Sequence, residues 1–334
     1  MSESGDRVDR PTGKGLQRLQ RVSWRSVLQV VLLVLALSVL VRTITGIDLG
    51  EVATELAAAS WALVGLAFVV AQSPRLTQTV STLGAAPRPL SARPVYLLQL
   101  AQGYVGLAVP TSAARVAMNV RFFQKQGFSS GAALAIGGLD SFAGFVVEAV
   151  LLLGLIAFTP RTLHFDLAAP SLPQWETILL ILVALAVVVG AVSILLPDHR
   201  RQLVDWARNL VTDGRSALRD LGSPRRLLLL LGGNLASILL FSVTLGLFAA
   251  ALGTTVSLSD LVVITISVSL LAGLLPIPGG IGVVETGLTF GLVAAGMPEG
   301  PAFTAVILYR TATFYLPPLW GYPAFRHLER IGML

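Results

Sequence analysis

Long stretches without a charged residue constrain the fold of this chain most. Val27–Val41, Ile178–Leu196 and Leu227–Leu252 contain no Asp, Glu, Lys or Arg. A helix of about 20 apolar residues is long enough to cross the roughly 30 Å hydrocarbon core of a bilayer. The whole chain is 54% hydrophobic and 13% charged, whereas soluble domains carry about 25% charged residues. The sequence therefore predicts an all-α polytopic membrane protein.

The distribution of charge in the loops predicts how the chain is oriented. By the positive-inside rule, loops that carry Lys and Arg lie in the cytoplasm, and loops without them lie outside. The basic tail 1–25 and the loop with Arg88 and Arg93 are predicted to be cytoplasmic, and the loop with Asp48 and Glu51 external. The chain has a pI of about 10.3. We interpret its basic residues as setting the topology and contacting anionic lipid headgroups, not as binding nucleic acid. We expect a multi-pass protein of the cell membrane with both termini in the cytoplasm.

The apolar pattern predicts about six full transmembrane helices and two re-entrant helical hairpins. The hairpins, 96–123 and 261–293, have legs too short to cross, and they enter from opposite sides of the membrane. Such an arrangement is an inverted-topology repeat, a common plan of transporters. The predicted spans are Ser26–Ile44, Trp61–Leu83, Ala132–Phe158, Ile178–Leu196, Leu227–Leu252 and Ala302–Tyr322, the last with a break at Pro317-Pro318.

The predicted organisation follows from these elements. A first repeat with its hairpin is followed by an external loop with the fourth span, an amphipathic interfacial linker and the rest of the second repeat. The segments are 1–25 (cytoplasmic tail), 26–159 (first repeat), 160–196 (external loop and fourth span), 197–226 (cytoplasmic linker), 227–325 (second repeat) and 326–334 (cytoplasmic tail).

Two pairs of charges lie inside the apolar sequence at one spacing. Arg115 precedes Asp140 by 25 residues, and Glu285 precedes Arg310 by 25 residues, 170 residues further along and with the signs reversed. A charge inside a membrane segment costs about 2.5–3.5 kcal/mol on insertion scales and is rarely kept without a partner or a task. We therefore predict one central site built from both halves. Whether Glu285 pairs with Arg115 or with Arg310 stays open at this level.

A broken helix precedes the second pair. Pro278, Gly280 and Gly282 interrupt helical hydrogen bonding between Pro276 and Glu285. A half-helix that starts near this point directs its positive end toward an anionic group. These residues are therefore candidates for the substrate path.

Further polar residues lie in the predicted spans. Asp140, Glu148 and Glu285 are candidates for proton coupling, and for Glu148 we favour a hydrogen bond between helices or exposure to an external vestibule. Arg75 is interpreted as snorkelling to an interface. We interpret the remaining polar residues as helix-packing hydrogen bonds: Gln99, Gln102, Asn119 and Asn234.

The segment from Pro278 to Glu285, with Arg310 in the next span, resembles the second signature of the lysylphosphatidylglycerol synthase transmembrane-region family. The resemblance covers roughly residues 26–326 and is most specific over 274–315. It implies a lipid flippase-like fold that moves a headgroup-modified lipid across the bilayer. The resemblance also implies which residues line the headgroup path: Pro278, Gly280, Gly282, Glu285 and Arg310.

The first half departs from that family pattern. Arg115 follows Ser112-Ala113-Ala114 without the usual glycine-rich turn and acid, and Gly137-Gly138-Leu139 stands before Asp140. The substrate therefore differs from that of close family members, or this half of the site is altered. No aminoacyl-transfer domain follows in the sequence, so lysyl transfer is not expected.

Enzyme chemistry and metal binding find little support in the composition. The chain has no cysteine and three histidines, which lie far apart in predicted loops and tail, so a histidine metal cluster or a Ser-His-Asp arrangement within the membrane is excluded. We expect no cofactor and no resident metal, and we expect a non-enzyme.

The sequence as a whole predicts a flippase-like transporter for an anionic or lipid-linked headgroup, such as a phospholipid or polyprenyl phosphate. Two alternatives remain: a secondary transporter of a small solute, and a non-transporting membrane subunit that docks a glycosyltransferase or synthase. Membrane lipids are the expected partners and nucleic acid is not. A membrane enzyme partner and a homo-oligomer stay open.

Overall fold

The computed structural model describes residues 49–107, 111–158, 223–274 and 278–334. In these residues all regular structure is helical, as the apolar periodicity predicts. The expected spans Ser26–Ile44 and Ile178–Leu196 lie outside the described residues, as does nearly all of the linker 197–226.

The helices of the first half are α2 (Leu49–Ala58), α3 (Trp61–Val70), α4 (Ser73–Ala85), α5 (Ala92–Val105), α6 (Thr111–Lys125) and α7 (Ser130–Phe158). Those of the second half are α10 (Pro224–Ala251), α11 (Leu258–Leu274), the 3₁₀ turn η2 (Pro278–Gly280), α12 (Val283–Ala294), α13 (Glu299–Arg310), the π turn η3 (Thr311–Tyr315) and α14 (Pro318–Arg330).

Two of the described helices are long and apolar enough to cross a membrane. They are Ser130–Leu155 within α7 and Pro224–Ala251, which is α10. A third span is obtained if the bent pair Val52–Ala58 and Trp61–Ala85, which meet at 94°, is counted as one. The helices expected from Ala132 and from Leu227 are therefore confirmed.

Both expected hairpins consist of two short helices in contact. α5 and α6 flank the break that follows Val105, and α11 and α12 flank the break around η2. In each pair the helices are shorter than a bilayer crossing requires, because a helix rises about 1.5 Å per residue. The side from which each pair enters the membrane stays a prediction.

The expected sixth span is not a single helix. α13 passes into the π turn η3, where the Leu316 amide donates to the Thr311 carbonyl at 2.9 Å, and α14 begins at Pro318. Proline lacks the amide hydrogen and clashes with the preceding turn, so a helix cannot continue unbroken through Pro317-Pro318. The predicted break is confirmed, and the chain beyond it forms a separate helix that packs against α5.

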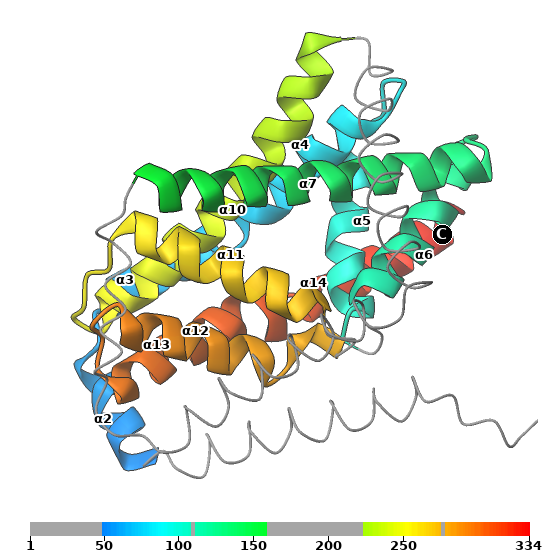
Figure 1. Cartoon of the computed structure of the whole chain (residues 1–334). Helices are drawn as coiled ribbons and strands as arrows, with labels where there is room; N and C mark the ends of the chain where they lie inside the picture. The colour runs from blue at the N-terminus through cyan, green and yellow to red at the C-terminus, as the bar shows by residue number, and fades with distance from the viewer. Residues whose placement is uncertain (1–48, 108–110, 159–222, 275–277) are drawn as a thin grey trace, which may run out of the picture.

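α10 connects two hydrophobic cores. Near its start Leu230 belongs to the core of α5, α6, α7 and α14, and near its end Leu245 and Phe248 belong to the core of α3 and α11–α13. α7 crosses in front of α4 and α10, with α11–α13 below one end and α5, α6 and α14 at the other (Figure 1). Polar side chains of α4, α7 and α10 meet between the two cores.

Glycine allows α4 and α10 to approach closely. A Cβ on Gly84 would lie 2.4 Å from the Leu230 amide nitrogen, and a Cβ on Gly233 would lie 2.6 Å from the Ser81 amide nitrogen. These neighbours are backbone atoms, which cannot move aside as a flexible side chain can. The contact between α4 and α10 therefore depends on both glycines.

We expect Gly233→Ala to destabilise the protein by about 1–3 kcal/mol, the usual cost of overpacking. The matched control is Gly232→Ala on the same helix, where an added Cβ meets nothing within 4 Å. There the higher helix propensity of alanine should leave stability unchanged or raise it by up to about 1 kcal/mol. Thermal unfolding of the two purified variants makes the comparison, and equal melting temperatures would contradict the close approach of α4 and α10.

Candidate functional site

The turn before α12 is built on left-handed backbone. Gly279 and Gly280 both have φ of 62°, and Gly282 has φ of 87°, a region that L side chains rarely adopt. Pro278 begins this turn, and its fixed φ favours such a start. The predicted break at Pro278, Gly280 and Gly282 is therefore present, and its geometry requires glycine.

The carboxylate of Glu285 caps the start of α12. Glu285 Oε2 accepts a hydrogen bond from the Gly282 amide at 2.7 Å, as in a capping box. This contact satisfies an amide that the helix itself leaves without an acceptor. A carboxylate also suits the positive end of the helix dipole.

Glu285 and Arg310 form a buried ion pair. Arg310 Nε lies 2.6 Å from Glu285 Oε1, and the two side chains are 7% and 1% exposed, respectively. The structure thus selects Arg310, within the second half, as the partner of Glu285. The sequence had left open the choice between Arg115 and Arg310.

Further contacts hold this pair in place. Arg310 Nη2 donates to the Gly279 carbonyl at 2.8 Å, and the Tyr315 hydroxyl donates to Glu285 Oε1 at 2.9 Å. The Arg310 guanidinium carbon lies 4.2 Å from the centre of the Phe314 ring. That ring fills the space over Gly279, where a Cβ would lie 2.0 Å from it. In this structure the pair is a closed assembly that fixes the broken helix.

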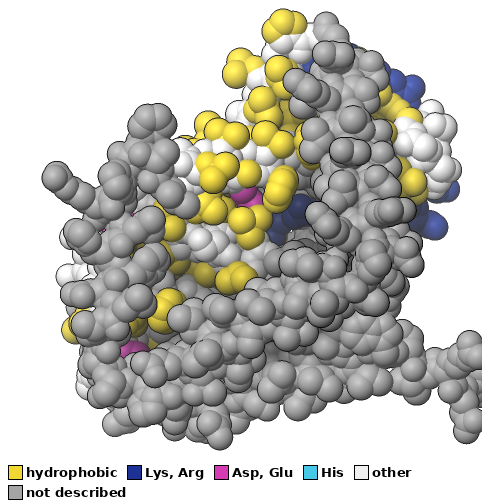
Figure 2. Space-filling view, viewed as in Figure 1, with side chains coloured by type: hydrophobic (Ala, Val, Ile, Leu, Met, Phe, Trp, Pro, Cys, Tyr) yellow, Lys and Arg dark blue, Asp and Glu magenta, His cyan; other side chains and the backbone are white. Residues whose placement is uncertain are grey.

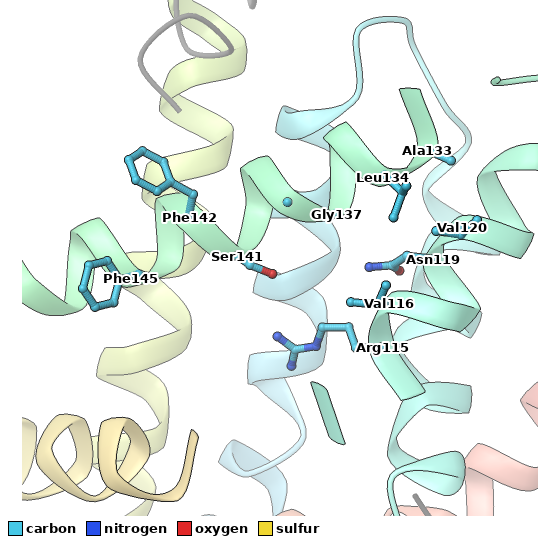
Figure 3. Close-up of a pocket in the computed structure, with 11 residues that line it drawn as sticks. Arg115, Val116, Asn119, Val120, Ala133, Leu134, Gly137, Ser141, Phe142 and Phe145 are labelled. Carbon is cyan, nitrogen blue, oxygen red and sulfur yellow. The ribbon is translucent and has the colours of Figure 1, made fainter. Parts of the chain in front are cut away.

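Arg115 has a different environment. It lies on the exposed side of α6, and no hydrogen bond or ion pair between described residues involves its side chain. It lines a cavity of about 410 Å³ between α6 and α7, where Ser141 of α7 and Asn119 of α6 also face the space (Figure 3). A guanidinium without a hydrogen bond or ion pair to any described residue therefore lies in the wall of a cavity next to a membrane helix.

The cavity is lined by the charge of Arg115 and by mostly apolar side chains. Such a combination suits a ligand with a charged part and a hydrophobic part. The lining residues are Arg115, Val116, Asn119 and Val120 of α6 and Ala133, Leu134, Gly137, Gly138, Ser141, Phe142 and Phe145 of α7.

Two further charges lie near Arg115. Arg75 of α4 and Glu148 of α7 are both close enough to interact electrostatically with it. Glu148 also accepts a hydrogen bond from Ser269 of α11 at 3.4 Å, which is one of the two alternatives expected for it. On this face an acidic and a basic patch lie side by side below α7, framed by hydrophobic side chains (Figure 2). Arg115 is therefore close both to a second guanidinium group and to a carboxylate.

Arg75 is the residue whose role the sequence interpretation missed. Its Nη1 donates to Gln78 Oε1 at 3.1 Å, and its Nη2 lies 3.5 Å from the position of a Cβ on Gly103. The side chain thus points between α4 and α5 instead of snorkelling outward. Its position well inside the apolar stretch 61–85 was the available signal, because charges at such positions are usually functional.

No ion pair between described residues joins Asp140 to Arg115, although the two share the spacing of Glu285 and Arg310. Instead Asp140 accepts hydrogen bonds from Ser81, from Thr82 Oγ1 at 2.9 Å and from Asn234 Nδ2 at 3.2 Å. It thus faces α4 and α10, away from α6. A rotation of a helix by part of a turn is enough to direct two such side chains toward different neighbours.

The other intramembrane amides connect helices, as predicted. Gln99 donates to Thr82 at 2.9 Å, and Gln102 donates to Asn119 at 2.7 Å. Asn234 does more than connect helices, because it also bonds Asp140. The amide cluster thus extends from α6 to α10.

The model of one family matches the sequence over most of its length. That family is described as the lysylphosphatidylglycerol synthase TM region, and the match covers residues 26–321. A comparison with curated proteins finds no match. The family match agrees with the apolar helices in identifying a membrane protein.

We expect Glu285→Gln to lower the free energy of unfolding by about 3–5 kcal/mol, because Arg310 would be left buried and uncompensated. Thermal or denaturant unfolding of the purified protein measures the change. Glu299→Gln is the control, since Glu299 is an exposed acid at the start of α13. If both variants unfold at the same temperature, the ion pair does not stabilise the turn.

Proposed function

We propose that this chain, which belongs to the lysylphosphatidylglycerol synthase transmembrane-region family, is a flippase-like transporter of lipids with an anionic or phosphate-linked headgroup. The observation that carries the proposal is the guanidinium of Arg115, which has no hydrogen bond or ion pair to a described residue and lies in the wall of the cavity between α6 and α7. A charge in this position is costly unless a ligand or partner compensates it.

The shape and lining of the cavity support a lipid as ligand. Leu134 and Phe145 of its wall are also exposed on the outside of α7, so the cavity lies next to the surface that faces lipid. Acyl chains would stay in the bilayer while the headgroup occupies the polar part of the cavity. A sealed pocket, as a small-solute transporter requires, would lack this lateral contact.

The charges around the cavity favour an anion. Arg115 and Arg75 together carry two positive charges, and Glu148 supplies one negative charge. A phosphate would balance the excess, and the planar guanidinium suits bidentate contacts to phosphate oxygens. Glu148 is also the acid best placed to exchange a proton with the cavity, because it is only partly buried.

The second half of the site has a supporting role in this proposal. Pro278, Gly280 and Gly282 form the break, and the pair of Glu285 with Arg310 holds it. A rigid break keeps the end of α12 in place while a headgroup passes. Arg310 would reach the headgroup only after its pair with Glu285 opens.

We extend the proposal to the topology of the whole chain. The order of α3–α4, the pair α5–α6 and α7 is repeated by α10, the pair α11–α12 and α13–α14. This order supports an inverted repeat with six spans, two re-entrant hairpins and both termini in the cytoplasm. Proteins of this kind reside in the cell membrane and have membrane lipids as partners.

Single cysteines test this topology, because the chain contains no cysteine of its own. A cysteine at Gln126 should react with a membrane-impermeant reagent only from the cytoplasm, and one at Gly300 only from outside. Both positions lie in turns or at helix ends. Labelling of both from the same side would exclude the inverted repeat.

Vesicles that contain the purified protein test the function. The protein should accelerate movement of an anionic phospholipid between leaflets, and Arg115→Gln should slow it roughly 10- to 100-fold. That range corresponds to the loss of one charge-assisted contact of about 1.5–3 kcal/mol. Arg115→Lys should recover part of the rate, because it keeps the charge but not the bidentate geometry.

Arg88→Gln is the matched control, since Arg88 is exposed and contacts Phe128 at the end of α6, away from the cavity. It removes the same charge and should leave the rate nearly unchanged. Equal rates for wild type and Arg115→Gln over a panel of anionic lipids, with both proteins folded, would overturn the proposal.

A further inference from the structure

The carboxylate of Asp140 is surrounded by polar side chains and lies outside the proposed headgroup path. Its Oδ1 accepts from Ser81 Oγ and from Asn234 Nδ2, and its Oδ2 accepts from Thr82 Oγ1 at 2.9 Å. Asn234 Nδ2 also lies 2.9 Å from Ser81 Oγ. Side chains of α4, α7 and α10 thus converge on one carboxylate.

This carboxylate has no cationic partner among the described residues. The ion pairs found there join Glu285 to Arg310 and Arg326 to Glu329. A carboxylate within a membrane-spanning helix is costly without a partner. A bound cation would supply the missing charge.

The ligands around Asp140 have the chemistry of a cation site. Two carboxylate oxygens, the hydroxyl oxygens of Ser81 and Thr82 and the amide oxygen of Asn234 are hard donors. Hydroxyl groups rotate, and an amide can turn its oxygen inward. The hydroxyl oxygens of Ser81 and Thr82, and the amide oxygen of Asn234 once the amide turns, can therefore face an ion.

Close helix packing favours a small ion of single charge. A Cβ on Gly144 would lie 2.9 Å from Asn234 Oδ1, and a Cβ on Gly233 would lie 2.6 Å from the Ser81 amide nitrogen. The three helices thus leave little room for expansion. Within the described part of the chain no group of three or more His, Cys, Asp or Glu could hold a metal ion, and a single carboxylate matches a monovalent charge.

A second layer of hydrogen bonds holds these ligands in place. Gln99 of α5 donates to Thr82 Oγ1 at 2.9 Å. Asn234 Nδ2 also donates to the Leu230 carbonyl of its own helix at 3.0 Å. Such outer contacts orient the atoms that bind an ion directly.

We propose that Asp140, Ser81, Thr82 and Asn234 form a Na⁺ site where α4, α7 and α10 meet. The site goes beyond the proposed lipid path and is adjacent to it, because the next residue after Asp140, Ser141, lines the cavity. A bound Na⁺ would fix the position of α7 and thereby the shape of the cavity wall. The site would also allow a Na⁺ gradient across the membrane to drive transport, as in inverted-repeat transporters that bind Na⁺.

Thermal unfolding of the purified full chain tests the ion site without any transport. The protein is heated in N-methylglucamine chloride, which NaCl or KCl replaces stepwise at constant ionic strength. A ligand that binds only the folded state raises its stability with concentration. We expect a saturable rise in the melting temperature with NaCl and a much smaller rise with KCl.

Asp140→Asn should abolish the NaCl-dependent rise, and Thr82→Val, which keeps the shape of the side chain, should shift its midpoint to at least several-fold higher NaCl. The control is Ser242→Ala on α10, because Ser242 bonds the carbonyl of Ile238 in its own helix; its response should equal that of wild type. Equal responses of wild type to NaCl and KCl, or an unchanged response in Thr82→Val, would overturn the Na⁺ site.

The two proposals fail separately. Arg115→Gln removes the headgroup contact and leaves every proposed Na⁺ ligand in place, so its NaCl response should match wild type. A protein that shows this response but moves no anionic lipid would retain the ion site and lose the proposed function. A protein that moves lipid without any NaCl response would retain the proposed function and lose the ion site.

Discussion

A charge inside a membrane helix has to be compensated, and the arrangement of this protein follows from how each charge is compensated. Glu285 and Arg310 compensate each other, and the residues that contact them belong to the same half of the chain. Arg115 has no such contact among the described residues and faces a cavity instead. The second half thus provides a fixed break in the helix, and the first half provides an open cation.

α7 connects the places where these charges act. Toward α4 and α10 it presents Asp140, toward α6 it presents the cavity residues around Ser141, and toward α11 it presents Glu148. A small rotation or shift of one helix would therefore change all three environments together. Close packing against α10 at Gly144 limits such movement in the present state. Coupling between a cation at Asp140 and the cavity would act through this helix.

How much of the fold and site the sequence could predict depended on the kind of signal. Long apolar stretches predicted α7 and α10, and the proline–glycine pattern predicted the broken helix before Glu285, because both rest on local backbone rules. The spacing of 25 residues left the partner of Glu285 open, and the same spacing between Arg115 and Asp140 does not correspond to an ion pair among the described residues. Which helix a side chain faces depends on helix rotation and on distant helices, and Asn234 and Ser81 enter that contact from other parts of the chain.

The central claim is that a lipid phosphate binds at the free guanidinium of the first half while the pair of the second half stays closed. A cryo-electron microscopy structure of the protein in nanodiscs of anionic lipid tests it most directly. The account predicts headgroup density within hydrogen-bond distance of Arg115, with Arg75 nearby, and an intact contact between Arg310 and Glu285. Headgroup density at Arg310, with that contact broken and Arg115 unoccupied, would contradict it.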